Sequence, residues 1–436
     1  MTPQQPTGLL TFIIIWFGQV VSTIGTYMTD FAIALWVWQL TSSASALTLV
    51  AFFSQILRIP TTVFAGIIVD RFNRKNLMIL GDSIAAISTI ALLALYLTHN
   101  LQIWHLYFTG AINGCFRQIQ DLAYEASLTQ IIPKQHYARA TSMGSVVHYG
   151  PVILAPAFAS SLYPLIGLAG ILLIDIFSFI VAIITLFLIA IPQPPQTKTE
   201  NQALANLFTD ITFGFHYLLT NRSLRNFLLA ISLFWFAHDF AESVGDPMIL
   251  ARSNSNPTVL ASISAAAGIS GVMGAIILSI WGGPKRRIYG MLLGFIGAGA
   301  SKTAFGLGRN LSVWIPAQFC SSLNFPLMDS CETAIWLAKV PPHLQGRVFA
   351  AKSLMSQLLS SFATLITGLL ADKVLEPAVI LKGGIFGSGK GTGISFLYVM
   401  GAVCMLLVGL FGFIFPSLRN IEKILPDSDE VILQQK

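Results

Sequence analysis

Long runs of apolar residues dominate this chain and restrict the folds that are open to it. A helix needs about 20 apolar residues to cross the hydrocarbon core of a bilayer, and twelve segments of the 436-residue chain meet that requirement. Only 10% of the residues are charged, whereas soluble domains carry about 25%, so the chain lacks the polar surface that water would require. The sequence therefore predicts an all-α membrane protein with twelve transmembrane helices in two pseudo-symmetric six-helix bundles.

The predicted spans form two groups of six, separated by the longest connection. The first group is Leu9–Gln39, Ala44–Val69, Asn76–Leu97, Trp104–Leu128, Thr141–Tyr163 and Leu168–Ile191. The second group is Leu224–Leu250, Val259–Trp281, Ile288–Leu307, Val313–Ala338, Val348–Leu370 and Ile394–Phe415. This spacing predicts an N-terminal bundle over 1–192, a linker over 193–223, a C-terminal bundle over 224–418 and a cytoplasmic tail over 419–436.

Lysine and arginine gather on one side of the predicted membrane. The even-numbered connections and the C-terminal tail hold 17 of the 25 basic residues, and the odd-numbered connections hold 5. Because cytoplasmic loops carry such an excess, both termini are predicted to be cytoplasmic. The net charge of +6 follows from these loops, so we expect a lipid bilayer as a partner and no nucleic acid.

The linker contains a predicted amphipathic helix between Leu207 and Leu219. Its apolar face consists of Leu207, Phe208, Ile211, Phe215 and Leu218. Such a helix suits the membrane surface, and it equally suits a simple connection between bundles.

A weak internal repeat supports the division into halves. A shift of 208 residues places Asp121 on Asp329 and Arg139 on Arg347. Repeated halves recur in secondary transporters.

The connection between the second and third spans carries the most specific pattern in the chain. It reads Gly66, Asp70, Arg71, Arg74 and Lys75 in the spacing G-x-x-x-D-R-x-x-R-K. The glycine allows close approach of a neighbouring helix, the acid can accept hydrogen bonds from an arginine or a helix N-terminus, and the basic residues hold the loop in the cytoplasm. A plain basic loop would need neither the glycine nor the acid at these positions.

This pattern resembles the signature loop of the major facilitator superfamily, where it latches the two halves in the outward-facing state. Further stretches resemble the macrolide-efflux and enterobactin-exporter branch of that family: Gly18-Gln19, Leu40–Ala44, Ile79–Asp82, Leu172–Asp175, Asp210–Leu218 with Leu224-Arg225, and Pro342–Val348. The resemblance covers nearly the whole chain and implies a central cavity, alternating access and proton-driven export across a bacterial inner membrane. The second-half counterpart, Gly282–Arg287, lacks the acid, so the direction of transport follows from the family alone.

Ionisable residues inside the spans are the candidate site residues, because a charge within the bilayer is costly unless it faces a cavity or a partner. These residues are Asp30, Arg58, Arg117, Asp121, Glu125, Asp239, Glu242, Lys302, Asp329 and Glu332. Most of them fall on helices that line or flank the cavity in the fold that the resemblance implies.

Arg117, Asp121 and Glu125 recur every four residues and therefore share one helix face. The two acids fit a self-neutralising salt-bridge ladder, and they also fit pairing with the basic loop described above. Arg117 fits a role in coupling and a role in packing. With Asp329 and Arg347, the two acids form a predicted cytoplasmic charge network.

Two groups of residues are hypothesised to bind protons. Asp30 and Arg58 lie at comparable depths on consecutive spans, where a proton would break their ion pair. Asp239 and Glu242 lie three residues apart beside His238. They either share a proton or face a solvated outer vestibule.

Other polar and aromatic residues carry weaker signals. His148 in the fifth span fits a core histidine better than a proton relay. Most of the aromatic residues in the spans are expected to pack or to anchor the helices at the interface, and some are expected to stack on an apolar substrate. They are Trp16, Trp36, Trp38, Phe234, Trp235, Phe236 and Trp336.

Catalytic signatures are absent from the sequence. It contains no phosphate-binding glycine loop with lysine, no Cys/His cluster with metal-ligand spacing and no nucleophile elbow, so we expect no enzyme activity, cofactor or metal. The expected function is export of a drug, macrolide or siderophore-like molecule by proton antiport through a monomer. The alternatives are a lipid or lysophospholipid flippase and, in a different class, a non-transporting receptor or assembly subunit.

Overall fold

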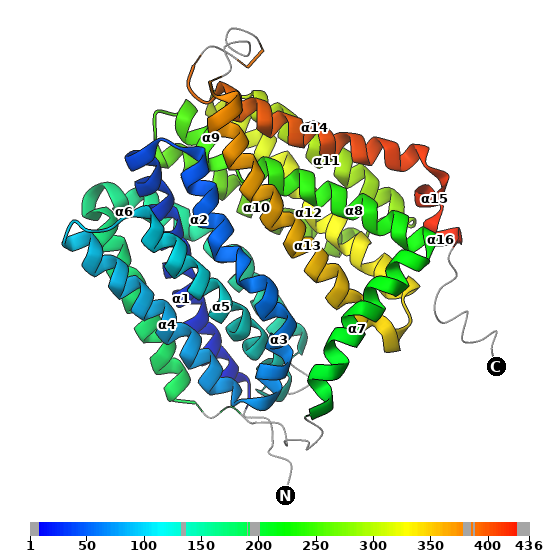
Figure 1. The fold of residues 1–436 in the computed structure, drawn as a ribbon, viewed down its shortest axis with the longest axis horizontal. Coiled ribbons are helices and arrows are strands. Elements are labelled where there is room, and N and C mark those ends of the chain that lie inside the picture. The colour runs from blue at the N-terminus through cyan, green and yellow to red at the C-terminus, as the bar shows by residue number, and fades with distance from the viewer. Residues whose placement is uncertain are drawn as a thin grey trace, which may run out of the picture. The chain divides into compact units, whose positions relative to one another are not determined.

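The protein is helical throughout the part of the chain that the structure describes. A computed structural model describes residues 8–131, 137–189, 191, 201–377, 385–386 and 389–424. Its helices form two compact units (Figure 1). Unit 1 consists of Met1–Ser42 and Leu49–Ala203, and unit 2 consists of Ser43–Thr48 and Leu204–Lys436.

The helices of unit 1 follow the predicted spans with one interruption. They are α1 (Leu9–Thr41), α2 (Ala44–Ile56), α3 (Arg58–Arg71), α4 (Arg74–Leu97), α5 (Ile103–Ile131) and α6 (Tyr137–Phe187). The second predicted span is divided into α2 and α3 at Leu57. Pro60 accounts for this break, because a proline ring clashes with the carbonyl four residues earlier, which belongs to Ile56.

The α6 segment contains two predicted spans. Its backbone leaves the helical region at Gly167, where φ is 64° and ψ is −171°. Glycine adopts a positive φ at little cost, so Gly167 ends one span and begins the next. This break falls between the predicted spans Thr141–Tyr163 and Leu168–Ile191.

Apart from the first residues of α2, unit 2 consists of the linker helix from Leu204 onward and the helices that follow it. Its elements are α7 (Asn201–Thr220), α8 (Arg222–Glu242), α9 (Gly245–Arg252), α10 (Pro257–Trp281), α11 (Arg287–Leu307), α12 (Leu311–Lys339), α13 (Pro342–Leu370), the π-helical turn η2 (Ala371–Leu375), α14 (Thr392–Ile414), α15 (Pro416–Arg419) and α16 (Ile421–Ile424). The predicted seventh span is divided into α8 and α9 at Ser243. Pro247 accounts for this break in the same way as Pro60, because the carbonyl four residues before it belongs to Ser243.

In the described part of the chain, twelve spans result when α2 with α3 and α8 with α9 are each counted once, α6 is counted twice, and the linker helix α7 and the short η2, α15 and α16 are left out. Eight stretches of the described residues are long and apolar enough to cross a membrane. The helices α5, α11 and α12 fall outside that set, and they carry Arg117, Lys302 and Glu332. The charged residues of these three helices therefore need partners inside the protein, and the candidate site is sought among those partners.

Each unit has an apolar core of its own. In unit 1, α1 packs on α6 and α4 packs on α5 and α6, around a cluster that includes Phe12 and Met78. In unit 2, α11 packs on α12 and α14, around a cluster that includes Phe227 and Trp336. Large apolar side chains such as Ile280 stay exposed on the surface, as lipid contact requires.

The linker helix α7 packs on unit 2. Leu218 is buried in the unit 2 core, and a side chain added at Gly214 would meet the backbone carbonyl of Arg347 on α13. Part of the predicted apolar face is thus covered by protein. The side chains of Leu207 and Phe208 lie outside the described part of the structure.

Candidate functional site

A pocket of about 240 Å³ opens in unit 2 between α8, α12 and α13. Its apolar and aromatic walls come from Leu228, Ile231, Trp235, Phe236 and Leu359. Its polar lining comes from Ser232, Asp329, Glu332, Thr333, Lys352 and Ser356. Apolar walls with a few placed polar groups are typical of a small-molecule site.

The charged groups of the pocket carry an excess of negative charge. Lys352 forms an ion pair with Glu332, whose side chain is only 7% exposed. The indole Nε1 of Trp235 donates to Glu332 Oε2 at 3.5 Å. Asp329 lies on the same helix within electrostatic range of both Glu332 and Lys352, and it is exposed. Two acids thus face one lysine.

The structure separates the aromatic residues that the sequence could not rank. Trp235 and Phe236 line the pocket, whereas Phe234 stacks on Phe295 in the core with ring centroids 3.8 Å apart. Trp336 is buried in the same core. Of these aromatic residues, Trp235 and Phe236 are therefore the two whose side chains line the pocket.

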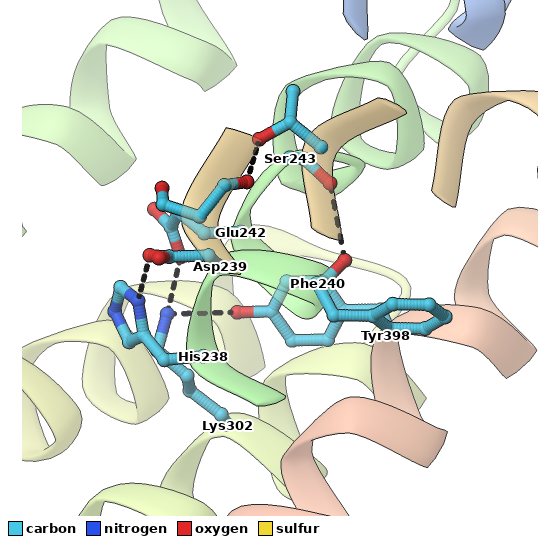
Figure 2. Close-up of polar contacts among 9 residues, drawn as sticks. His238, Asp239, Phe240, Glu242, Ser243, Lys302 and Tyr398 are labelled. Atoms are coloured by element: carbon cyan, nitrogen blue, oxygen red, sulfur yellow. Dashed lines mark hydrogen bonds and ion pairs between the residues drawn. The ribbon is translucent and has the colours of Figure 1, made fainter. Parts of the chain in front are cut away.

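A second cluster lies where α8 ends, and Figure 2 shows its members pointing toward one another. Lys302 of α11 forms an ion pair with Glu242, and its Nζ lies 3.4 Å from the hydroxyl oxygen of Tyr398 on α14. His238 Nδ1 lies 3.1 Å from Asp239 Oδ1. Asp239 and Glu242 therefore each contact a partner of their own, and within the described residues the two acids form no hydrogen bond with each other.

In unit 1, Asp30 interacts with Arg117 rather than with Arg58. Arg117 of α5 is within electrostatic range of Asp30 on α1, and its guanidinium carbon lies 5.7 Å from the ring centroid of Tyr27. Arg58 instead donates from Nε and Nη2 to Gln118 Oε1, at 3.3 and 3.0 Å. The structure thus brings together Asp30 and Arg117, and it does not form the ion pair between Asp30 and Arg58 that the sequence suggested.

The three α5 charges interact along one face. Asp121 is within electrostatic range of Arg117 and Arg58, and Glu125 is within range of Asp121. Both acids are exposed, and the charge near Glu125 is the like charge of Asp121, so the described residues of this face form no salt-bridge ladder.

Asp329 and Arg347, the second-half members of the predicted charge network, lie in different surroundings. Asp329 faces the pocket. The guanidinium carbon of Arg347 lies 5.4 Å from the ring centroid of Phe213 on the linker helix α7. The side chains of Arg139 and His148 lie outside the described part of the structure.

The loop between α3 and α4 anchors two other helices near their C-terminal ends. Arg74 Nη1 donates to the carbonyl of Ala126 on α5 at 2.7 Å. Lys75 Nζ donates to the carbonyls of Phe187 and Ile189, at 3.2 and 2.6 Å. Cationic side chains satisfy the last carbonyls of a helix and complement its dipole, so Lys75 fastens the end of α6. The carbonyl of Ala126 lies five residues before the end of α5, so Arg74 joins α4 to the last turns of α5 without capping it.

The remaining members of the loop are arranged differently. Asp70 lies 3.9 Å from Arg74, with its side chain 80% exposed, and Arg71 occupies the last turn of α3. A Cβ placed on Gly66 would meet no described atom within 4 Å. The close helix approach that we expected at Gly66 is therefore not found among the described residues of unit 1.

The second-half counterpart of this loop, before α11, repeats the anchor and supplies the acid from elsewhere. Arg287 Nη1 donates to the carbonyl of Ala334 on α12 at 3.1 Å. Ala126 and Ala334 stand 208 residues apart, the same shift as the sequence repeat. Glu422 of α16 accepts from the backbone N–H groups of Arg287 and Ile288, at 3.2 and 3.3 Å. The acid that this loop lacks comes from the C-terminal segment.

Two polar residues of these sites, and two further buried acids, were missed in the sequence analysis. Lys352 was assigned to a connection, and Tyr398 was not considered. Asp82 and Asp175 were noted only as parts of family-like stretches, although each is an acid inside a predicted span. The rule that selected Asp30 would have selected both of them.

The sequence as a whole matches the family model of the Major Facilitator Superfamily over residues 15–364. It is 26% identical over 375 residues to macrolide efflux protein A of Streptococcus pyogenes, covering 84% of this chain and 90% of that protein. It is 24% identical over 378 residues to YfiS of Bacillus subtilis, described as an uncharacterized MFS-type transporter, covering 84% of this chain and 87% of that protein.

Solved structures of transporters share the fold. A POT family transporter crystallised with a thioalcohol-conjugated peptide has a TM-score of 0.71 at 11% identity, covering 94% of this chain and 96% of that one. The nucleoside transporter NupG has a TM-score of 0.68 at 11% identity, covering 92% of this chain and 98% of that one. These likenesses confirm the predicted all-α fold of twelve spans in two six-helix bundles. With the family model matching most of its length, this multi-pass membrane protein belongs to the Major Facilitator Superfamily.

Proposed function

We propose that this transporter exports an apolar or amphipathic small molecule of the macrolide kind in exchange for protons. The observation that carries the proposal is the unit 2 pocket, where Trp235 and Phe236 meet the charges of Asp329, Glu332 and Lys352. The likeness to macrolide efflux protein A supports the substrate class.

The pocket favours an amphipathic molecule that carries a positive charge. Indole and phenyl rings offer flat apolar faces on which a hydrophobic molecule can stack, and two acids against one lysine attract a cation. Burial in apolar surroundings strengthens that attraction relative to bulk water.

Proton exchange would supply the driving force. Ionisable groups inside a membrane mark proton and substrate pathways, and here they lie in both units, at Asp30 with Arg117 and at Glu242 with Lys302. A proton drives transport when the two conformational states bind it with different affinity. Both termini would face the cytoplasm of the bacterial inner membrane, with the chain acting as a monomer.

The experiment that tests this function is accumulation of a radiolabelled macrolide in cells. Cells that make the protein should accumulate less macrolide than empty-vector cells, and an uncoupler should abolish the difference. Trp235→Ala should also abolish it, while Trp281→Ala should not, because Trp281 is an exposed tryptophan outside the pocket.

Equal accumulation in producing and empty-vector cells would contradict macrolide export. A matched assay with a fluorescent lysophospholipid then tests the flippase alternative. An export activity that survives the uncoupler would contradict proton exchange.

A further inference from the structure

We propose that Asp175 is a proton-binding site in unit 1, on a helix that contributes nothing to the pocket, and that it takes part in proton coupling. The role of Asp175 in coupling rests on the proposed function, whereas the binding of a proton does not.

Asp175 is enclosed by protein. It lies on α6 and is 1% exposed. The neighbouring helix α1 approaches it at Gly25, where an added Cβ would lie 3.0 Å from Asp175 Oδ1 and 2.9 Å from Ser178 Cβ. Water is excluded by this packing, and an ionised carboxylate in such a place pays a desolvation penalty of several kcal/mol unless a cation offsets it.

No cation offsets that penalty. Within the described residues, Asp175 forms no ion pair, and its hydrogen-bond donor is the neutral hydroxyl of Thr89, 3.1 Å from Oδ2. By contrast, the buried Lys302 of unit 2 has both Glu242 and Tyr398 as partners. An uncharged carboxyl group is therefore the form of Asp175 that this site accommodates.

Two orphaned oxygen atoms point to where the proton resides. Asp175 Oδ1 and Thr29 Oγ1 are buried, and each lacks a hydrogen-bond partner in the described structure. Thr29 of α1 faces Asp175. A proton on Oδ1 gives the carboxyl group an O–H donor, and the Thr29 hydroxyl oxygen can accept it. The Thr29 hydroxyl can also donate to an ionised Oδ1, so this pair accommodates either form of the carboxyl group, and burial without a cation is what favours the protonated one.

The charged surroundings link this proton to the candidate residues already described. The ionisable group that faces Asp175 from α1 is Asp30, whereas α4 contributes the hydroxyl of Thr89 and α6 that of Ser178. The negative charge of Asp30 opposes a second negative charge on Asp175. Asp30 is exposed and interacts with Arg117, so the charge state of this pair influences how readily Asp175 binds a proton.

Asp82 serves as a matched internal control. It is also buried, at 2% exposure, but both of its oxygens accept amide hydrogen bonds. Gln120 Nε2 donates to Oδ1 at 2.8 Å, and Gln19 Nε2 donates to Oδ2 at 3.4 Å. Hydrogen bonds to a carboxylate favour its charged form. The two amide hydrogen bonds thus stabilise the ionised form of Asp82, and Asp175 lacks such bonds within the described residues.

Infrared difference spectroscopy on the purified full-length protein tests the protonation directly. At neutral pH, Asp175→Asn should lose a carbonyl stretching band of a protonated carboxylic acid, and Asp82→Asn should leave that band in place. Thr29→Val keeps the side-chain shape and should shift the band, because the carboxyl group loses its acceptor. An unchanged band in Asp175→Asn would overturn the proposal.

Transport in proteoliposomes tests the coupling. Asp175→Asn should retain exchange of labelled macrolide across the membrane and lose accumulation driven by an imposed pH gradient. Uphill accumulation equal to that of the unmodified protein would overturn the role in coupling. If the unmodified protein moves no macrolide, the proposed function fails, and the infrared band still decides whether Asp175 holds a proton.

Discussion

The Nζ atom of Lys302 meets the carboxylate of Glu242 and lies 5.6 Å from the centroid of the Tyr398 ring. The two partners of this ion pair differ in burial, since the lysine side chain is 1% exposed and the glutamate side chain 52%. Removing the glutamate would leave a buried charge without its counter-ion. Removing the lysine would leave a carboxylate that water can solvate.

The two single variants of this pair should therefore differ in stability. Glu242→Ala is expected to cost about 3 kcal/mol in free energy of unfolding, as for other buried pairs that lose one partner. Lys302→Met should cost less, because methionine fills much of the same volume without a charge. The measurement is the apparent melting temperature of the purified protein, followed by intrinsic tryptophan fluorescence.

The double variant provides the control for this comparison. Adding Lys302→Met to Glu242→Ala should restore part of the lost stability, because the uncompensated charge is gone. Equal losses in both single variants, with no recovery in the double variant, would contradict the assigned asymmetry.

The contact between Glu422 and the start of α11 predicts a role for the C-terminal segment in stability. Arg286 precedes α11 without capping it through its side chain, and Glu422 accepts from the first two backbone N–H groups. Glu422→Ala should cost about 1 kcal/mol, the usual loss for a helix cap. Thermal melting should show this loss, and Lys423→Ala, an exposed neighbour, should melt like the unmodified protein.

Two glycines of unit 1 should respond in opposite ways to substitution by alanine. Gly25→Ala would place its Cβ against Ser178 and force α1 away from α6, so thermal stability should fall. Gly66→Ala meets open space, and alanine is favoured over glycine within a helix by about 0.5–1 kcal/mol. Thermal melting of Gly66→Ala should occur at the same temperature as that of the unmodified protein or higher. If this folded variant lost transport, Gly66 would be needed for transport and not for folding.

The excess of negative charge in the pocket predicts a charge-dependent affinity. Asp329→Asn should weaken binding of a cationic macrolide about tenfold, equivalent to about 1.4 kcal/mol. Binding of an uncharged analogue should change little, because Asp329 contributes charge rather than apolar contact. Titration with both ligands, followed by Trp235 fluorescence, measures the two dissociation constants. An equal loss for both ligands would contradict an electrostatic role.

Much of the fold could be predicted from the sequence, because hydropathy acts locally along the chain. Apolar runs of the required length predicted the spans, and a glycine at 167 stands where one span ends and the next begins. The interruptions at Leu57 and Ser243 were not predicted, although a proline, Pro60 or Pro247, follows each of them closely in the sequence. Prolines are common in membrane helices, so their presence alone does not show which of them breaks a helix.

The partners of the charged residues were less accessible to sequence reasoning. Arg117, Asp121 and Glu125 were placed on one face by their spacing along a single helix, and the structure keeps them within electrostatic range of one another. Asp30 was assigned to Arg58 from their similar depth, and it interacts with Arg117 instead. The depth of a residue in the membrane follows from its position along the helix. The neighbouring helix that its side chain faces depends on how the helix is rotated about its axis, which depth does not give.

By itself, the sequence determined the number of spans, the placement of basic residues on alternate connections and the family to which the chain belongs. Each of these depends on residue type along a continuous segment, because lipid solvates helices one at a time. Tertiary structure alone decided that Asp175 meets Thr89 and that Lys302 meets Glu242 and Tyr398. Those contacts join helices far apart in the chain, and they depend on how each helix is rotated about its axis when its neighbours pack against it.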